Sequence, residues 1–103
     1  MKGFQTQNVV FIDLSYGQQT TFGHVLRKLY TKDNDLMALA PGRAGHPHDG
    51  SQHSLYLRGD RKDCTAFLEL VRERYKEASP TIALVIDAIN AGERYIEATK
   101  LGR

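Results

Sequence analysis

The stretch SPTIALVI at residues 79–86 decides the architecture of this chain, because it fits two kinds of secondary structure. Residues 81–86 form a short, mostly apolar run, which is typical of a buried strand. The same stretch also fits the start of a long helix, capped by Ser79 and with Pro80 at its first position. An aspartate, an asparagine and a glycine follow closely and would weaken a helix, so we predict a strand.

A second apolar run lies near the N-terminus, where residues 8–14 read Asn-Val-Val-Phe-Ile-Asp-Leu. Its β-branched and aromatic residues predict another buried strand. Thr20 or Thr21 is suited to cap the helix that follows. The inner stripe of this helix consists of apolar side chains at helical spacing: Phe22, Val25, Leu26, Leu29 and Tyr30.

The middle of the chain contains two further candidate strands. Residues 36–40 are short and apolar and stop at a proline and a glycine, so we predict a strand, although their alanine and methionine also suit a helix. Residues 53–58 alternate polar and apolar side chains, which predicts a half-buried strand. Asp60 or Asp63 then caps a second helix, and residues 91–101 suit a short terminal helix.

This order of elements predicts an α+β fold in one compact domain spanning residues 1–103, a length typical of a single domain. The first six elements match a ferredoxin-like split βαβ arrangement, β-α-β-β-α-β, in which two βαβ halves share one sheet. The additional C-terminal helix would follow the last strand. In this arrangement the first and third strands are central neighbours.

Composition excludes several classes of protein. Lys and Arg number 14 against 12 Asp and Glu, so the net charge is +2, which is compatible with an anionic partner but far from a polybasic tail. The single cysteine, Cys64, cannot form an internal disulfide, which favours a reducing compartment. The apolar runs are too short for a membrane span. We therefore expect a cytoplasmic protein with no membrane partner.

The densest polar segment is residues 43–53, which hold three of the four histidines. Imidazole and carboxylate groups are ligands that zinc accepts, and the candidate metal ligands are His46, His48, Asp49 and His53. Their spacing matches no strong zinc signature, and the same residues also suit a solvated hairpin loop. We therefore predict no cofactor and keep zinc as the alternative.

Two short motifs resemble those of phage-type M15 zinc peptidases. Residues 51–60 read SQHSLYLRGD, which is similar to the family motif Ser-x-His-x-x-x-Leu-x-x-Asp. Residues 22–27, Phe-Gly-His-Val-Leu-Arg, resemble the upstream segment Phe-Gly-x-x-x-Arg. The resemblance implies a metal-dependent hydrolase in which His53 and Asp60 bind the metal and Arg27 binds substrate.

A different candidate site follows from the predicted sheet. Alternation along residues 53–58 places Tyr56 and Arg58 on one face, and Phe11 lies on the neighbouring strand. Aromatic rings stack on unpaired bases and arginine contacts phosphate, so Phe11, Tyr56 and Arg58, with Arg43 in the adjacent loop, are candidate ligand-binding residues. Phe11 and Tyr56 equally suit packing beneath the terminal helix or in a dimer interface.

These features together favour a small non-catalytic binding module. It would use an open sheet face and the His/Arg-rich hairpin loop to bind single-stranded nucleic acid or another anionic ligand. Two alternatives stay open: a metal-dependent hydrolase of the peptidase type described above, and a module for protein–protein interaction or homodimer formation.

Overall fold

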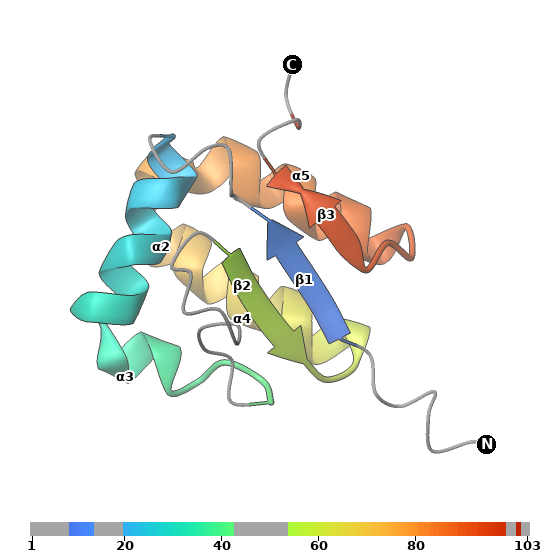
Figure 1. Cartoon of the computed structure of the whole chain (residues 1–103), viewed down its shortest axis with the longest axis horizontal. Coiled ribbons are helices and arrows are strands. Elements are labelled where there is room, and N and C mark those ends of the chain that lie inside the picture. The colour runs from blue at the N-terminus through green and yellow to red at the C-terminus, as the bar shows by residue number, and fades with distance from the viewer. Residues whose placement is uncertain (1–8, 14–19, 43–53, 99–100, 102–103) are drawn as a thin grey trace.

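A computed structural model of the chain describes residues 9–13, 20–42, 54–98 and 101 (Figure 1). The strands are β1 (Val9–Asp13), β2 (Ser54–Arg58) and β3 (Tyr95–Glu97). The α-helices are α2 (Thr21–Thr31), α3 (Asn34–Met37), α4 (Arg61–Arg74) and α5 (Ser79–Asn90), and a short 3-10 helix, η1, spans Lys76–Ala78. The mixed α+β class is therefore confirmed.

The strands form one three-stranded mixed sheet in the order β2-β1-β3. β2 pairs with β1 in the antiparallel direction, and Tyr56 lies opposite Phe11 in this register. β3 pairs with the other edge of β1 in the parallel direction, and Tyr95 lies opposite the same Phe11 position. The central strand is thus flanked at position 11 by a tyrosine on each neighbouring strand.

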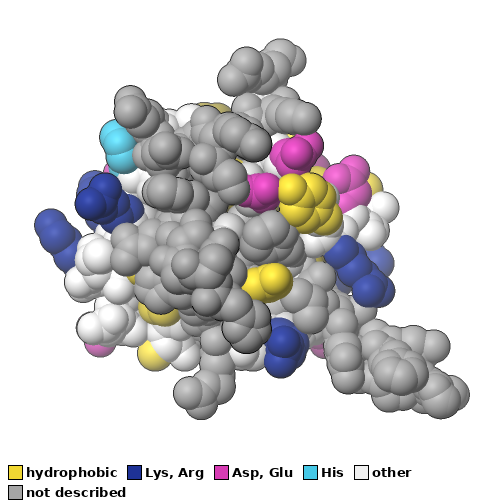
Figure 2. Space-filling view, viewed as in Figure 1, with side chains coloured by type: hydrophobic (Ala, Val, Ile, Leu, Met, Phe, Trp, Pro, Cys, Tyr) yellow, Lys and Arg dark blue, Asp and Glu magenta, His cyan; other side chains and the backbone are white. Residues whose placement is uncertain are grey.

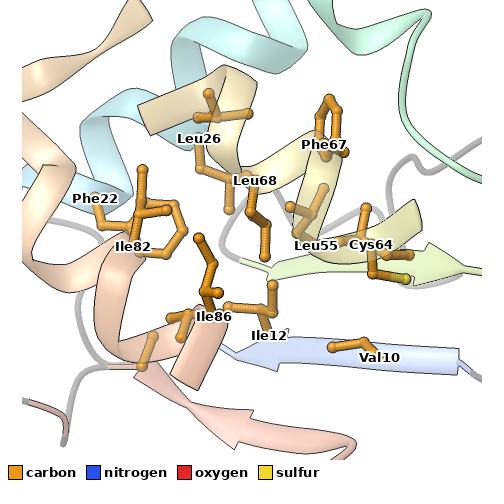
Figure 3. Close-up of a cluster of buried hydrophobic side chains, with 14 of the residues drawn as sticks. Val10, Ile12, Phe22, Leu26, Leu55, Cys64, Phe67, Leu68, Ile82 and Ile86 are labelled. Carbon is orange, nitrogen blue, oxygen red and sulfur yellow. The ribbon is translucent and has the colours of Figure 1, made fainter. Parts of the chain in front are cut away.

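The hydrophobic core lies between one face of this sheet and the helices. α4 and α5 lie behind the sheet in Figure 1 and pack against each other. Figure 3 shows side chains of β1 and β2 pointing toward those of α4 and α5. The buried side chains of the sheet are Val10, Ile12, Leu55, Leu57 and Ile96. Burying each such side chain contributes about 1.5–3 kcal/mol, so this face anchors the sheet to the helices.

Two helices begin at caps that the sequence predicts. The Thr20 hydroxyl accepts a hydrogen bond from the Gly23 backbone N–H (3.1 Å) and starts α2. The Asp60 carboxylate accepts one from the Asp63 N–H (2.8 Å) and starts α4. Each cap satisfies a first-turn donor that has no partner within its helix. The apolar stripe of the first helix is also confirmed, because Phe22, Val25, Leu26 and Leu29 are buried in α2. The buried residues of α4 are Cys64, Phe67, Leu68 and Val71.

The strand predicted at residues 36–40 is wrong, because this segment begins inside α3 and continues as a turn. The Asp33 carboxylate caps α3 by accepting a hydrogen bond from the Leu36 N–H at 3.2 Å. Leu36 and Ala40 are buried while Leu39 is 61% exposed. Ala38 between them is exposed, so the buried positions recur after four residues, as in a helical turn, and not at every second residue, as in a strand.

The strand predicted at residues 81–86 is also wrong, because the whole segment belongs to α5. Pro80 lies in the first turn, where its missing N–H costs nothing. The buried residues of α5 are Ile82, Val85, Ile86 and Ile89, which follow the i, i+3, i+4, i+7 pattern of a helix face. Packing of this face against α4 outweighs the weak helix preference of the polar residues that follow.

The terminal helix predicted for residues 91–101 is replaced in the described range by β3. Gly92 adopts φ +97° after the last turn of α5. The Glu93 N–H bonds to the Ala88 carbonyl (3.0 Å) and the Gly92 N–H to that of Ile89 (2.9 Å), the Schellman pattern that ends a helix. The chain then returns along β1, with Ile96 in the core.

Two of the four strands needed for the ferredoxin-like arrangement are therefore absent: residues 81–86 belong to α5, and residues 36–40 are the end of α3 and a turn. In the described residues, the order of the secondary-structure elements differs from that arrangement, and the third strand of the sheet is β3, which is parallel to β1. No helix in the described ranges has both the length and the apolar character required to cross a bilayer.

Candidate functional site

The sheet face opposite the core, here called the outer face, brings together polar and aromatic side chains from all three strands. They are Asp13, Tyr56, Arg58, Tyr95 and Glu97. Tyr56 is 37% exposed and Tyr95 is 54% exposed. Because neighbouring strands are about 4.8 Å apart, these two tyrosine positions are separated by roughly 10 Å across the central strand. The outer face therefore presents two accessible rings on one surface.

One end of the outer face is acidic. Asp13 and Glu97 are register partners at the carboxyl ends of the parallel strands β1 and β3. The Tyr95 hydroxyl donates a hydrogen bond to Asp13 Oδ2 at 2.6 Å, which fixes the direction of the Tyr95 ring. Figure 2, viewed onto this face, shows acidic side chains gathered around a hydrophobic one over β3.

The other end of the outer face carries Arg58, the last residue of β2, which lies opposite Val9. This residue is exposed, and its backbone N–H donates to the Pro41 carbonyl at 3.2 Å. Gly42, which follows Pro41, has φ +70°. A Cβ at this position would meet Cβ and the carbonyl oxygen of Arg58. The backbone of Arg58 is thus in close contact with Gly42 and hydrogen-bonded to Pro41.

The edge strand β2 is also fixed from the side of α2. The Tyr30 hydroxyl donates a hydrogen bond to the Ser54 carbonyl at 2.6 Å. Burial raises the pKa of Tyr30 above its ordinary value, so the hydroxyl keeps its proton and remains a donor at neutral pH. This bond positions the start of the strand that carries Tyr56 and Arg58.

The structure places only some of the predicted site residues. The candidate metal ligands His46, His48, Asp49 and His53, and the candidate ligand-binding residue Arg43, lie outside the described residues. Phe11 is described by its backbone, at the centre of the outer face, and its side chain is outside the description. The described residues contain no group of three or more His, Cys, Asp or Glu side chains arranged to hold a metal ion.

The two other residues of the peptidase resemblance do lie in the described ranges. Asp60 caps α4, and one of its carboxylate oxygens accepts the Asp63 N–H. Arg27 is exposed on the outer surface of α2. Both side chains are therefore placed, whereas the predicted ligand His53 is not.

Sequence reasoning missed Tyr95, because it assigned residues 91–101 to a helix. The signal that could have found it is the alternation of Tyr95, Ile96 and Glu97 directly after the helix-ending Gly92. With Tyr95 included, the outer face offers two exposed rings, one guanidinium and two carboxylates. No model of a known protein family matches this chain, and no curated protein or solved structure matches it either.

Proposed function

We propose that the outer face binds single-stranded nucleic acid, with Tyr56 and Tyr95 stacking on two bases and Arg58 contacting a phosphate. The observation that carries this proposal is the exposure of two tyrosines on one sheet face, at register positions that flank the same residue of β1. Aromatic side chains on an exposed surface stack with bases of any sequence, and each such contact contributes about 1–3 kcal/mol to affinity.

The separation of the rings favours a single strand over a duplex. Tyrosine positions roughly 10 Å apart are too distant for two bases that remain stacked on each other, so the bases must be splayed. Splayed bases expose their ring faces, whereas the bases of a duplex hide them. Because the Tyr95 hydroxyl is bonded to Asp13, one of the two rings is oriented before the ligand arrives.

The charges of the outer face give the bound strand a direction. Arg58 attracts a phosphate at one end, while Asp13 and Glu97 repel phosphates at the other. Carboxylate oxygens also accept hydrogen bonds from the exocyclic amino group of cytosine. We therefore expect the sugar–phosphate backbone near Arg58 and base edges near the acidic end.

Fluorescence anisotropy with a labelled oligodeoxythymidylate 12-mer tests this proposal. Tyr56→Ala and Tyr95→Ala should each weaken binding by about 5- to 150-fold, the equivalent of losing one stacked base. Tyr56→Phe keeps the ring and should bind almost normally. Leu70→Ala, which removes an exposed apolar side chain from α4, is the matched control.

Unchanged affinity in the double variant Tyr56→Ala/Tyr95→Ala would overturn the proposal. A chain that binds no oligonucleotide but forms a dimer by light scattering, and loses the dimer in the same double variant, would assign the outer face to self-association. Circular dichroism of each variant confirms that the fold is retained.

A further inference from the structure

The outer surface of α2 carries a row of basic side chains that the proposed function does not use. His24, Arg27, Lys28, Thr31 and Lys32 are all exposed and line an open groove of about 400 Å³. Residues 24, 28 and 32 are four apart, and so are 27 and 31, so these side chains lie on one helix face, about 12 Å long at 1.5 Å per residue. Figure 2 shows histidine and Lys/Arg side chains side by side over this helix, away from the middle of the sheet.

Most of this positive charge is available to a ligand. Arg27 and Lys32 form no ion pair with any residue that the structure describes. Lys28 approaches Glu77 at 3.7 Å and lies over the Tyr75 ring at 5.8 Å, with about half of its side chain still exposed. An exposed pair of this kind is weak and exchanges readily for another anion.

The carboxylate nearest in sequence, Asp33, does not cancel the charge of Lys32. Its two oxygens accept hydrogen bonds from Arg74 Nη1 at 2.9 and 3.1 Å, and Oδ2 also accepts from the Tyr75 hydroxyl at 2.6 Å. Asp33 is therefore neutralised by Arg74 and held by α4. Two other surface hollows formed by described residues are lined by carboxylates as well as cations, whereas the groove on α2 is lined by no carboxylate.

We propose that this groove on α2 binds the phosphodiester backbone of nucleic acid, independently of base stacking on the outer face. A row of cations about 12 Å long is long enough to contact more than one successive phosphate of a single strand. The groove has no Phe, Tyr, Trp, Leu, Ile, Val or Met lining residue, so it offers little to an apolar peptide or a lipid chain. The positive charges of the groove are complementary to the negative charges of a linear chain of phosphates.

An abasic oligonucleotide 12-mer, which has the backbone but no bases to stack, separates this proposal from the previous one. It should bind the intact chain, with an affinity that falls as salt is raised. Arg27→Gln/Lys32→Gln should weaken this binding and reduce the slope of log K against log salt by about 1.4, or 0.7 for each lost contact to a single strand. Tyr56→Ala/Tyr95→Ala should leave the affinity for the abasic strand unchanged.

The matched control is Arg61→Gln/Lys62→Gln, which removes the same charge from exposed positions in the first turn of α4. Failure of the abasic strand to bind would overturn the proposal. So would an equal loss of affinity in the control, because that would show a response to net charge and not to the groove. Both outcomes are independent of whether thymidylate binding depends on the two tyrosines.

Discussion

The two faces of the sheet differ completely in chemistry, although their residues alternate along the same strands. On β2, Leu55 and Leu57 are fully buried against the helices. The alternate residues of the same strand, Tyr56 and Arg58, are exposed. On β3, Ile96 is buried and Tyr95 is 54% exposed. The period of two in a strand thus separates residues that hold the sheet in place from residues that remain accessible to a ligand.

Because of this difference, we expect substitutions on the inner face to change stability and substitutions on the outer face to change the proposed binding. Inner-face side chains are buried against the helices, so shortening one leaves a cavity. Outer-face side chains border solvent, so shortening one removes a contact surface and creates no enclosed space. Variants on the two faces should therefore affect different measurements.

The largest effect is expected from Leu57→Ala on the inner face. It should reduce the free energy of unfolding by about 2–5 kcal/mol, as is typical for truncation of a fully buried leucine. Tyr56→Ala, one residue away on the outer face, should cost about 1 kcal/mol or less. Urea unfolding of both variants gives the comparison, and equal losses would show that the outer face is packed as a core.

A smaller effect is expected from Gly42→Ala, which acts on the outer face through the backbone. The φ of +70° alone costs about 1–3 kcal/mol for a residue with a side chain, and the new Cβ would also meet Arg58. Gly92→Ala is the matched control, because its φ is +97° but a Cβ there has nothing within 4 Å. Both variants should lose stability, and only Gly42→Ala should in addition weaken oligonucleotide binding by displacing Arg58.

An oligonucleotide affinity that is the same in Gly42→Ala and Gly92→Ala would break the link between Gly42 and the outer face. The anisotropy assay described above measures it, with urea unfolding as the check on stability. A Gly42→Ala variant more stable than Gly92→Ala would contradict the close approach of Gly42 to β2.

Part of this architecture follows from local sequence signals. The apolar run at residues 8–14 and the alternation at 53–58 identify β1 and β2. Thr20 and Asp60 mark the starts of α2 and α4, because capping chemistry depends only on neighbouring residues. The shared face of Tyr56 and Arg58 follows from alternation alone, and so was predictable.

The C-terminal elements could not be predicted in the same way. In α5 the buried positions Ile82, Val85 and Ile86 are mixed with the further apolar residues Ala83 and Leu84, so the helical period is hidden within a continuous apolar run. Whether such a run is helix or strand is decided by its packing partner, here α4. β3 has three residues, and its pairing partner β1 is distant in sequence.

That error also determined which part of the candidate site was missed. Tyr95 reaches the outer face only through the parallel pairing of β3 with β1. A prediction that places residues 91–101 in a helix has no reason to group Tyr95 with Tyr56. Local sequence patterns do not show which distant strands pair, and this is why both β3 and the place of Tyr95 in the candidate site were missed.

The smallest effect is expected from Asp33→Asn, which tests the hydrogen bonds and the ion pair that Asp33 forms with Tyr75 and Arg74, away from both sheet faces. The hydrogen bond from Tyr75 is the main cause that lowers the pKa of the Asp33 carboxyl, and Arg74 adds to it. A lowered pKa means that the charged form stabilises the fold at pH values above the ordinary pKa of about 3.9, and that this contribution is lost as pH falls through the lower folded-state pKa. Asparagine keeps an oxygen to cap α3 but removes the charge that pairs with Arg74, whose side chain is about half exposed, so the loss at pH 7 should be about 1 kcal/mol or less.

Urea unfolding at pH 7 and at pH 3 measures this contribution. The difference between the original chain and Asp33→Asn should be complete at pH 7 and smaller at pH 3, which lies below the ordinary pKa that the carboxyl has in the unfolded chain. Asp35→Asn, which removes an exposed carboxylate from the same helix, controls for the change in net charge. A difference that stays constant between the two pH values, or a loss at pH 7 as large as that of Leu57→Ala, would show that surface links contribute as much to stability as the inner face of the sheet does.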